Sequence, residues 1–232
     1  MKKRYGIIKD NLKRIYYHNI GEKLRDKILQ LRNPIYNPNK IYRPYFDKTK
    51  TIYIHIPKVA GTSIGTALYG EDPYHYCLSS FEVKDEKKFS YYFKFSFVRN
   101  PWDRIVSSYL YAKKSYLKDK YHSLGFIALY ENFENFVINW VNRDNVNNHY
   151  FFFPQMKYIT NLKGDIGLDF LGKYENIDSD FRAICQKIGI DAVLPLLNKT
   201  EHSHYSDYYS SKTKDIIFKV YKDDIQMLNY DF

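Results

Sequence analysis

The sequence predicts an α/β protein in which a mainly parallel central sheet is flanked by helices. Three apolar runs that end at turn signals are typical of buried strands, over residues 51–56, 91–98 and 168–174. Segments with helical spacing of apolar residues lie between and after them, and such alternation favours a parallel sheet covered by helices. At 232 residues, the chain is long enough for one domain with a substantial core.

The N-terminal part differs from the remainder in charge. Residues 1–50 hold 14 Lys and Arg against 4 Asp and Glu, a net charge of +10, whereas the other 22 basic and 22 acidic residues cancel. This uneven distribution argues against a uniformly basic nucleic-acid-binding protein. We therefore expect a basic helical extension with a connector over residues 1–48, and an α/β domain over residues 49–232.

An apolar stripe with spacings of three to five residues runs through residues 8–31 and predicts one or two helices, interrupted near Gly21. Most Lys and Arg side chains lie off this stripe. Two interpretations stay open. The helix rests on an anionic membrane surface or polymer, or it packs its stripe on the core and exposes a solvated basic face. A proline-punctuated, extended connector is expected over residues 33–44.

Other features of the sequence concern the compartment. We find no apolar run long enough for a transmembrane helix and no pattern of a signal peptide. Cys77 and Cys185 lie far apart in the sequence, which favours free thiols in a reducing compartment. We therefore expect a cytoplasmic protein, with contact to the inner face of the membrane if the N-terminal helix binds anionic lipid.

The stretch from Tyr53 to Ser63, YIHIPKVAGTS, predicts a buried strand, a tight turn and the start of a helix over about residues 62–68. The first N–H groups of a helix are unpaired and lie at the positive end of its dipole, so such a turn holds anions. Lys58 adds a positive charge, and Thr62 and Ser63 add hydroxyl donors. We predict a P-loop-like loop that binds phosphate or sulfate.

The second strand leads into Arg99, Asn100 and Pro101. Asn100 is a suitable N-cap and Pro101 fits the first position of a helix that we expect to reach about residue 114. An arginine at the carboxyl end of a strand, opposite a phosphate loop, indicates a second phosphate held without a metal ion. Loops of nucleoside triphosphatases carry lysine directly before the hydroxyl residue, whereas Lys58 precedes Thr62 by four residues.

Two alternative functions remain at this point: a nucleotide-dependent kinase, and a non-catalytic module that binds an anionic polymer or a membrane.

Further helices are predicted over residues 131–141, 178–188 and 213–228. The segments 113–125 and 142–155 are interpreted as loops. If the protein transfers a group, these loops would contribute to the choice of the acceptor substrate.

Two motifs resemble those of a known family. IPKVAGTS (56–63) resembles the 5′-phosphosulfate loop of sulfotransferases, and FVRNPWDRIVSSY (97–109) resembles their 3′-phosphate motif. The resemblance is closest to the carbohydrate sulfotransferases of the Golgi and their bacterial relatives, and it covers roughly residues 50–230. Both motifs in this order and spacing form a specific signal. The basic N-terminal region has no counterpart.

The resemblance implies that the donor is 3′-phosphoadenosine 5′-phosphosulfate and that the acceptor is a hydroxyl of a carbohydrate, in a polysaccharide or a glycolipid, with no metal ion. Lys58 would neutralise the leaving oxygen. Arg99 and Ser107 would hold the 3′-phosphate. The 5′-phosphate would lie on the loop residues Lys58, Val59, Ala60, Gly61, Thr62 and Ser63. Lys199 is the one full cation between Leu197 and Tyr205, where the family usually carries more basic residues.

The acceptor hydroxyl needs a base near neutral pH, and histidine is the natural candidate. His75 lies between the two motifs, where the resemblance places the catalytic histidine of the family. His55 is expected to serve structure. The reserve candidates for the base are His149, His202, His204 and, more remotely, Glu82.

Overall fold

A computed structural model of the chain describes residues 41–119, 122–195 and 203–232. The predicted helices of residues 8–31, Lys199 and His202 lie outside the described residues. Their predictions therefore stay predictions.

Three parallel strands form the sheet, in the order β1 (Thr51–Ile54), β2 (Phe93–Val98) and β3 (Phe170–Lys173). Each lies within a predicted apolar run. Tyr53 pairs with Phe95 in the register of β1 and β2, and their rings stack at 5.0 Å. All four residues of β1 are buried, as expected for a parallel sheet covered on both faces. The predicted parallel α/β fold is confirmed.

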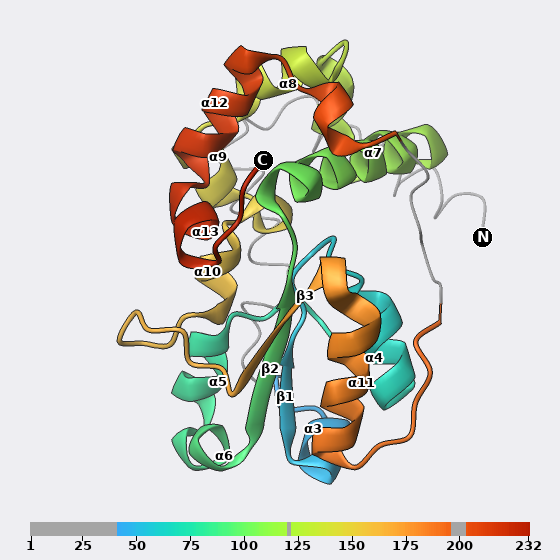
Figure 1. Cartoon of the computed structure of the whole chain (residues 1–232), viewed down its shortest axis with the longest axis vertical. Helices are drawn as coiled ribbons and strands as arrows, with labels where there is room; N and C mark the ends of the chain where they lie inside the picture. Colours follow the sequence, from blue (N-terminus) through green and yellow to red (C-terminus); the bar gives the residue numbers. More distant parts are fainter. Residues whose placement is uncertain (1–40, 120–121, 196–202) are drawn as a thin grey trace, which may run out of the picture.

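Helices cover both faces of the sheet. α4 (Gly61–Tyr69) and α11 (Ile177–Ile188) lie to one side, and α5 (Leu78–Lys84) and α6 (Glu86–Tyr91) lie to the other (Figure 1). Buried apolar side chains of α4, α5 and α11 form one cluster with those of the strands, and Phe89 of α6 packs against it.

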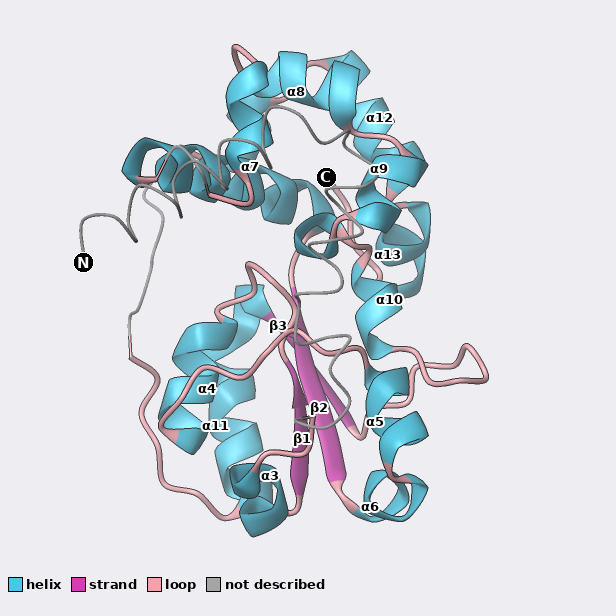
Figure 2. Ribbon diagram, turned by 180° about the vertical axis from the view of Figure 1, so that it is seen from behind, coloured by secondary structure: helices cyan, strands magenta, loops and turns pink. Residues whose placement is uncertain are grey.

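A second layer of helices lies beyond the carboxyl ends of the strands (Figure 2). It contains α7 (Pro101–Lys118), η3 (Gly125–Leu129), α8 (Phe133–Trp140), α9 (Arg143–Asn148), η4 (Tyr150–Phe152), α10 (Gln155–Ile159), η6 (Tyr205–Tyr208), α12 (Ser211–Val220) and α13 (Lys222–Met227). The buried apolar residues of α7, η3, α8, η4 and α12 belong to a second cluster, separate from the cluster around the sheet. The candidate site lies where the two clusters meet, because β2 leads directly into α7.

The predicted extended connector is wrong at its end, because Pro44 opens the helix α3 (Pro44–Thr49). Proline suits the first turn of a helix, where its missing N–H would be unpaired in any case. Ile41 and Phe46 are 1% and 2% exposed and pack into the cluster around the sheet. The chain therefore enters the core before residue 49, and the division of domains at residue 48 stays a prediction.

The single helix predicted over residues 213–228 is also wrong, because the chain forms α12 and α13 with a break at Tyr221. The Tyr221 side chain is buried, and its hydroxyl donates to the Phe152 carbonyl at 2.7 Å. The change of direction places Asp224 against the start of α10. The segments 113–125 and 142–155 are not simply loops, since they include the end of α7, α9 and η4.

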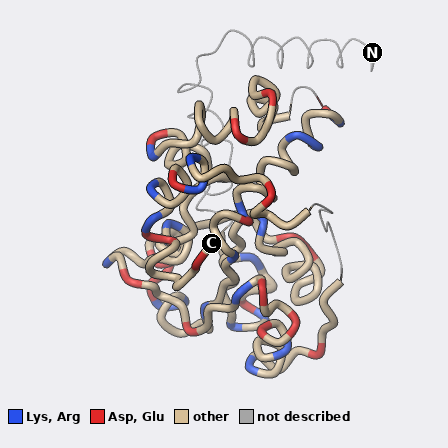
Figure 3. Tube along the Cα trace, turned by 45° about the horizontal axis from the view of Figure 1, so that its top comes forward, with Lys and Arg blue, Asp and Glu red and all other residues tan. Residues whose placement is uncertain are grey.

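Charges of both signs are interspersed along the described chain (Figure 3). None of the helices in the described ranges is long and apolar enough to cross a membrane. Cys77 and Cys185 are free, as the sequence predicts.

Candidate active site

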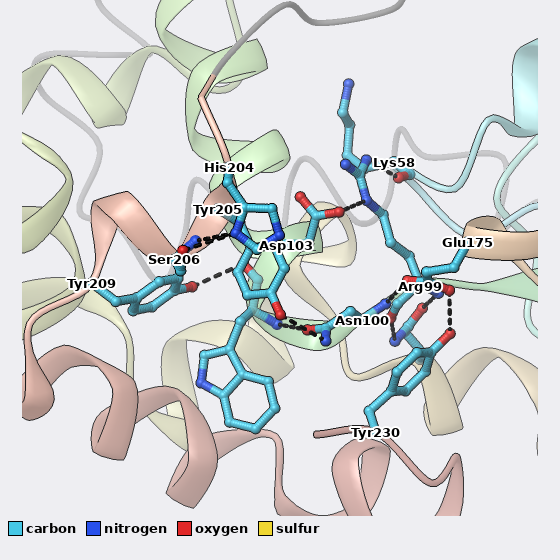
Figure 4. A network of polar contacts seen from close by, with 12 residues as sticks. Lys58, Arg99, Asn100, Asp103, Glu175, His204, Tyr205, Ser206, Tyr209 and Tyr230 are labelled. Carbon is cyan, nitrogen blue, oxygen red and sulfur yellow. Dashed lines mark hydrogen bonds and ion pairs between the residues drawn. The ribbon is translucent and has the colours of Figure 1, made fainter. Parts of the chain in front are cut away.

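The parallel sheet brings three loops to one edge. β1 leads through residues 55–60 into α4, β2 leads through Arg99 and Asn100 into α7, and β3 leads into η5 (Tyr174–Asn176). Binding sites of parallel α/β proteins lie at this edge, because the loops after the carboxyl ends of the strands converge there. Figure 4 shows the polar contacts that join these segments.

The loop before α4 has an unusual backbone. Lys58 and Ala60 adopt left-handed conformations with φ of 71° and 62°, which side chains with a Cβ rarely adopt. A left-handed residue followed by a right-handed one turns successive N–H groups into one concavity, and Ala60 followed by the helical Gly61 has this form. Gly61 is required by close packing, because a Cβ there would lie 1.7 Å from Cδ2 of His55.

The Thr62 hydroxyl of this loop has a partner within the protein, and the role of the Thr62 and Ser63 hydroxyls as donors to an anion stays a prediction. Thr62 Oγ1 donates to the Asp72 carboxylate at 2.9 Å, and the same carboxylate lies 3.1 Å from Nδ1 of His55. Ser63 is 4% exposed and Val59 is fully buried. The described contact of the Thr62 hydroxyl is therefore structural, whereas the backbone N–H groups and Lys58 remain suited to an anion.

Lys58 is half-buried, and its Nζ lies 4.3 Å from the centre of the Tyr111 ring. Burial lowers the pKa of Lys58 to about 8, with further contributions from the positive charges of Arg99 and Lys114. Three cations near one loop favour the binding of an anion there, since a negative charge would offset both the burial and the repulsion.

Arg99 is 7% exposed and is held by several groups at once. Its Nε donates to Asp103 at 2.8 Å, and its guanidinium lies 4.1 Å from the centre of the Tyr174 ring. Its Nη1 donates to the carbonyl of Lys58 at 3.2 Å. This last bond joins the two motifs that the sequence predicts to hold two phosphates, and it fixes them side by side (Figure 4).

Asn100 begins α7 as the sequence predicts. Its side-chain oxygen accepts from the Trp102 N–H at 3.0 Å, and Pro101 occupies the first helical position. Its own N–H donates to the Glu175 carboxylate at 2.7 Å, and Glu175 also accepts from the Tyr230 hydroxyl at 2.9 Å. η5, which follows β3, thus supports the start of α7 through Glu175.

Gln155 holds the backbone of Arg99 from the other side. Its amide oxygen accepts from the Arg99 N–H at 2.9 Å, and its amide nitrogen donates to the Arg99 carbonyl at 2.8 Å. The Gln155 side chain is fully buried. Asp224 accepts from the N–H groups of Gln155 and Met156 at 2.7 and 2.9 Å, and burial raises its pKa to about 6.

Sequence reasoning missed Gln155, Glu175 and Asp224. Each acts on main-chain groups of a segment 55 or more residues away, and no local pattern marks such a contact. Gln155 lies at the end of a segment interpreted as a loop. The proline directly before it, at the start of α10, was the one local sign of a structured position.

Ser107 lies in α7 and is 2% exposed. It follows Asp103 by four residues, so the two share the helix face that Asp103 turns toward Arg99. This position is compatible with the predicted phosphate clamp. Lys199, the last predicted donor contact, lies outside the described residues.

His75 lies against the first loop. Its Nδ1 is 2.9 Å from the carbonyl oxygen of His55, and because a carbonyl only accepts, Nδ1 carries the proton. The Nε2 of the neutral ring then has its lone pair available. Burial, followed by the proximity of His55, lowers the pKa of His75 to about 3, so the ring is neutral at pH 7. This is the protonation state that a general base requires.

The other candidates for the base have structural contacts. His55 Nδ1 lies 2.8 Å from the Pro73 carbonyl, in line with its predicted structural role. His149 is 4% exposed among the aromatic rings of the second cluster, and His204 Nδ1 lies 2.8 Å from the Ser206 hydroxyl. Glu82 accepts from the Leu162 N–H at 2.7 Å. His75 is joined to the Lys58 loop through its bond to the His55 carbonyl.

Comparison with known proteins gives two matches. Residues 45–231 match the model of a family described as the sulfotransferase family. An uncharacterized protein of the archaeon Archaeoglobus fulgidus is 34% identical over 122 residues, which are 52% of this chain and 88% of that relative. No solved structure matches.

Proposed function

Because the chain belongs to the sulfotransferase family, we propose that it transfers the sulfuryl group of 3′-phosphoadenosine 5′-phosphosulfate to a carbohydrate hydroxyl. Membership of the family supports sulfuryl transfer to an acceptor in general. The donor, the carbohydrate acceptor and the roles of single residues are our proposal. We further propose that the acceptor belongs to a polysaccharide or a glycolipid.

The contact between Arg99 and Lys58 carries the proposal. A donor with two separate phosphate groups needs two anion sites at a fixed distance, and the bond from Arg99 Nη1 to the Lys58 carbonyl links these sites directly. A guanidinium can bind a phosphate through two parallel N–H groups, which suits Arg99 to the 3′-phosphate. Ser107, one helical turn beyond Asp103, would complete this contact.

The reaction forms a bond between the acceptor oxygen and sulfur and breaks the bond between sulfur and the oxygen that bridges to the 5′-phosphate. The electron pair of the broken bond stays on the bridging oxygen, where the Lys58 ammonium stabilises it. Nε2 of His75 takes the acceptor proton. The low pKa of His75 describes the free protein, and the negative charges of a bound donor would raise it.

A cytoplasmic location, at the inner face of the membrane, also belongs to the proposal. The basic excess of residues 1–50 supports it, because anionic lipids attract such segments. Deletion of residues 1–40 tests this part separately. The truncated protein should keep nucleotide binding and lose sedimentation with vesicles that contain phosphatidylserine.

Titration calorimetry with adenosine 3′,5′-bisphosphate, in the presence of a metal chelator, tests the donor. We expect binding that Arg99→Ala weakens by about tenfold or more, since a charge-assisted contact to phosphate is lost. Arg182→Ala, on the exposed face of α11, is the matched control. Absence of binding would contradict the proposal. Binding of magnesium ATP in a separate titration without the chelator, in place of the bisphosphate, would favour a kinase.

Incubation with a labelled sulfuryl donor and a panel of glycans and glycolipids, followed by mass analysis, tests the acceptor. Lys58→Ala and His75→Ala should each lower the turnover strongly. His75→Ala should leave the nucleotide affinity largely unchanged, because His75 would contact the acceptor and not the donor. Unchanged turnover in either variant would refute the role given to that residue.

A further inference from the structure

The side chain of Lys58 is directed toward an aromatic ring of α7. Its Nζ lies 4.3 Å from the centre of the Tyr111 ring, and in Figure 4 the side chain extends away from the network around Asn100 and Glu175. Among the described residues, no carboxylate forms an ion pair with this ammonium. The Tyr111 ring is therefore its described electrostatic partner.

The ring itself is held in place. Tyr111 stacks on Phe151 of η4, with 5.4 Å between the ring centres and 25° between the ring planes. Phe151 is 6% exposed and belongs to the second buried cluster, whereas Tyr111 is 37% exposed. A ring fixed from behind by a buried neighbour presents a constant position to a cation.

The charged groups nearest to Lys58 in its surroundings are positive. Arg99 and Lys114 are both positive and lie close enough to act on Lys58. An aromatic face attracts an ammonium only weakly when the site is partly exposed, whereas a phosphate or sulfate group brings full negative charges. An anion on the loop would therefore take the ammonium from the ring.

We propose that Tyr111 holds Lys58 away from the donor position in the free protein, and that Lys58 leaves the ring when the nucleotide binds. The inference rests on the proposed function, since it takes the nucleotide as the anion. Breaking the contact with the ring opposes nucleotide binding. The ring therefore weakens the affinity for the nucleotide by roughly two- to fivefold, the usual strength of an exposed cation–π contact.

The direction in which the nucleotide affinity changes when the Tyr111 ring is removed tests this proposal. Tyr111→Leu keeps an apolar cover on Phe151 but removes the aromatic face, so it should bind adenosine 3′,5′-bisphosphate two- to fivefold more tightly in calorimetry. Tyr111→Phe keeps the face and should not give this gain. A ring that positions Lys58 for the donor would give the opposite sign, because its loss would weaken binding.

The same substitution in a protein that also carries Lys58→Met tests whether the gain in affinity depends on the Lys58 ammonium. Combined with Lys58→Met, Tyr111→Leu should give no gain, because there is no ammonium to release. An equal gain in both backgrounds, or no gain in the wild-type background, would overturn the inference. Absence of nucleotide binding by the wild-type protein would overturn the proposed function and this inference together, whereas binding without the gain would overturn the inference alone. Thermal unfolding checks that each variant is folded.

Discussion

Replacement of Gln155 by Leu tests how the site positions its arginine. Leucine has nearly the volume of glutamine but lacks both amide groups. The substitution therefore leaves the N–H and the carbonyl of Arg99 without the partners that hold them at 2.9 and 2.8 Å. Gln155 is fully buried and Arg99 is 7% exposed, so water has little access to either main-chain group.

The magnitude follows from the two lost hydrogen bonds. A buried polar group left without a partner costs about 1–3 kcal/mol, so two such groups lower the free energy of unfolding by about 2–6 kcal/mol. If the β2 end shifts to find new partners, the guanidinium of Arg99 moves with its backbone. We then expect the affinity for adenosine 3′,5′-bisphosphate to fall by about tenfold or more, because two parallel N–H contacts to phosphate depend on geometry.

Urea unfolding measures the stability of this variant, and titration calorimetry under conditions where it is folded measures its affinity. Gln186→Leu, at an exposed position of α11, is the matched control and should change neither quantity. A Gln155→Leu protein that is destabilised but binds the nucleotide as tightly as the wild type would refute the positioning role. Gln155 would then serve the fold alone.

Three further predictions concern the loop and its neighbours. Nucleotide binding at pH 8.5 should be accompanied by the uptake of about 0.7 proton, because the pKa of Lys58 in the free protein is about 8 and a bound anion raises it. Calorimetry in two buffers of different ionisation enthalpy measures this uptake. An enthalpy that is the same in both buffers would contradict it. The Lys58→Arg variant should take up no proton. The pKa of His75 is about 3 in the folded protein and lies below its value in the unfolded chain, so below about pH 6.5 only the unfolded chain binds the proton. The wild-type protein should therefore lose about 2 kcal/mol of its free energy of unfolding between pH 7 and pH 5 on account of His75. The His75→Gln variant should lack this part of the loss. Urea unfolding at both pH values checks this, and equal pH dependence of the two proteins would exclude a buried neutral His75. Gly61→Ala should lower the free energy of unfolding by about 1–3 kcal/mol, because its Cβ would lie 1.7 Å from the His55 ring, and an unchanged melting temperature would show that the loop can move aside.

The sequence predicted those parts of the site that depend on neighbouring residues. Short-range signals predict the strand before Lys58, the helix after it, and the start of α7 at Asn100 and Pro101. These signals are apolar runs, capping residues and a proline at the first position of a helix. Parallel strands then bring the two motifs to one edge without further information. For this reason the fold class could be derived from the sequence, whereas the two anion sites stay predictions.

Other parts depend on residues far apart in the chain. The short helices α9 and α10 have too few residues to be stable alone, so packing decides them and no strong periodicity announces them. The break at Tyr221 arises because Tyr221 and Asp224 bind groups of residues 152–156. Local patterns of residues 213–228 contain no sign of those partners.

By itself the sequence determined the three strands, the helices that follow the first two of them, and the positions of Lys58 and Arg99 after those strands. Only the tertiary structure decided how these groups are held: Arg99 between Gln155 and the Lys58 carbonyl, Asn100 on Glu175, and Lys58 at the Tyr111 ring. The physical reason is that side-chain type and local spacing are properties of the chain. Burial, hydrogen bonds to distant backbone groups and shifts of pKa arise from what the fold places around each residue.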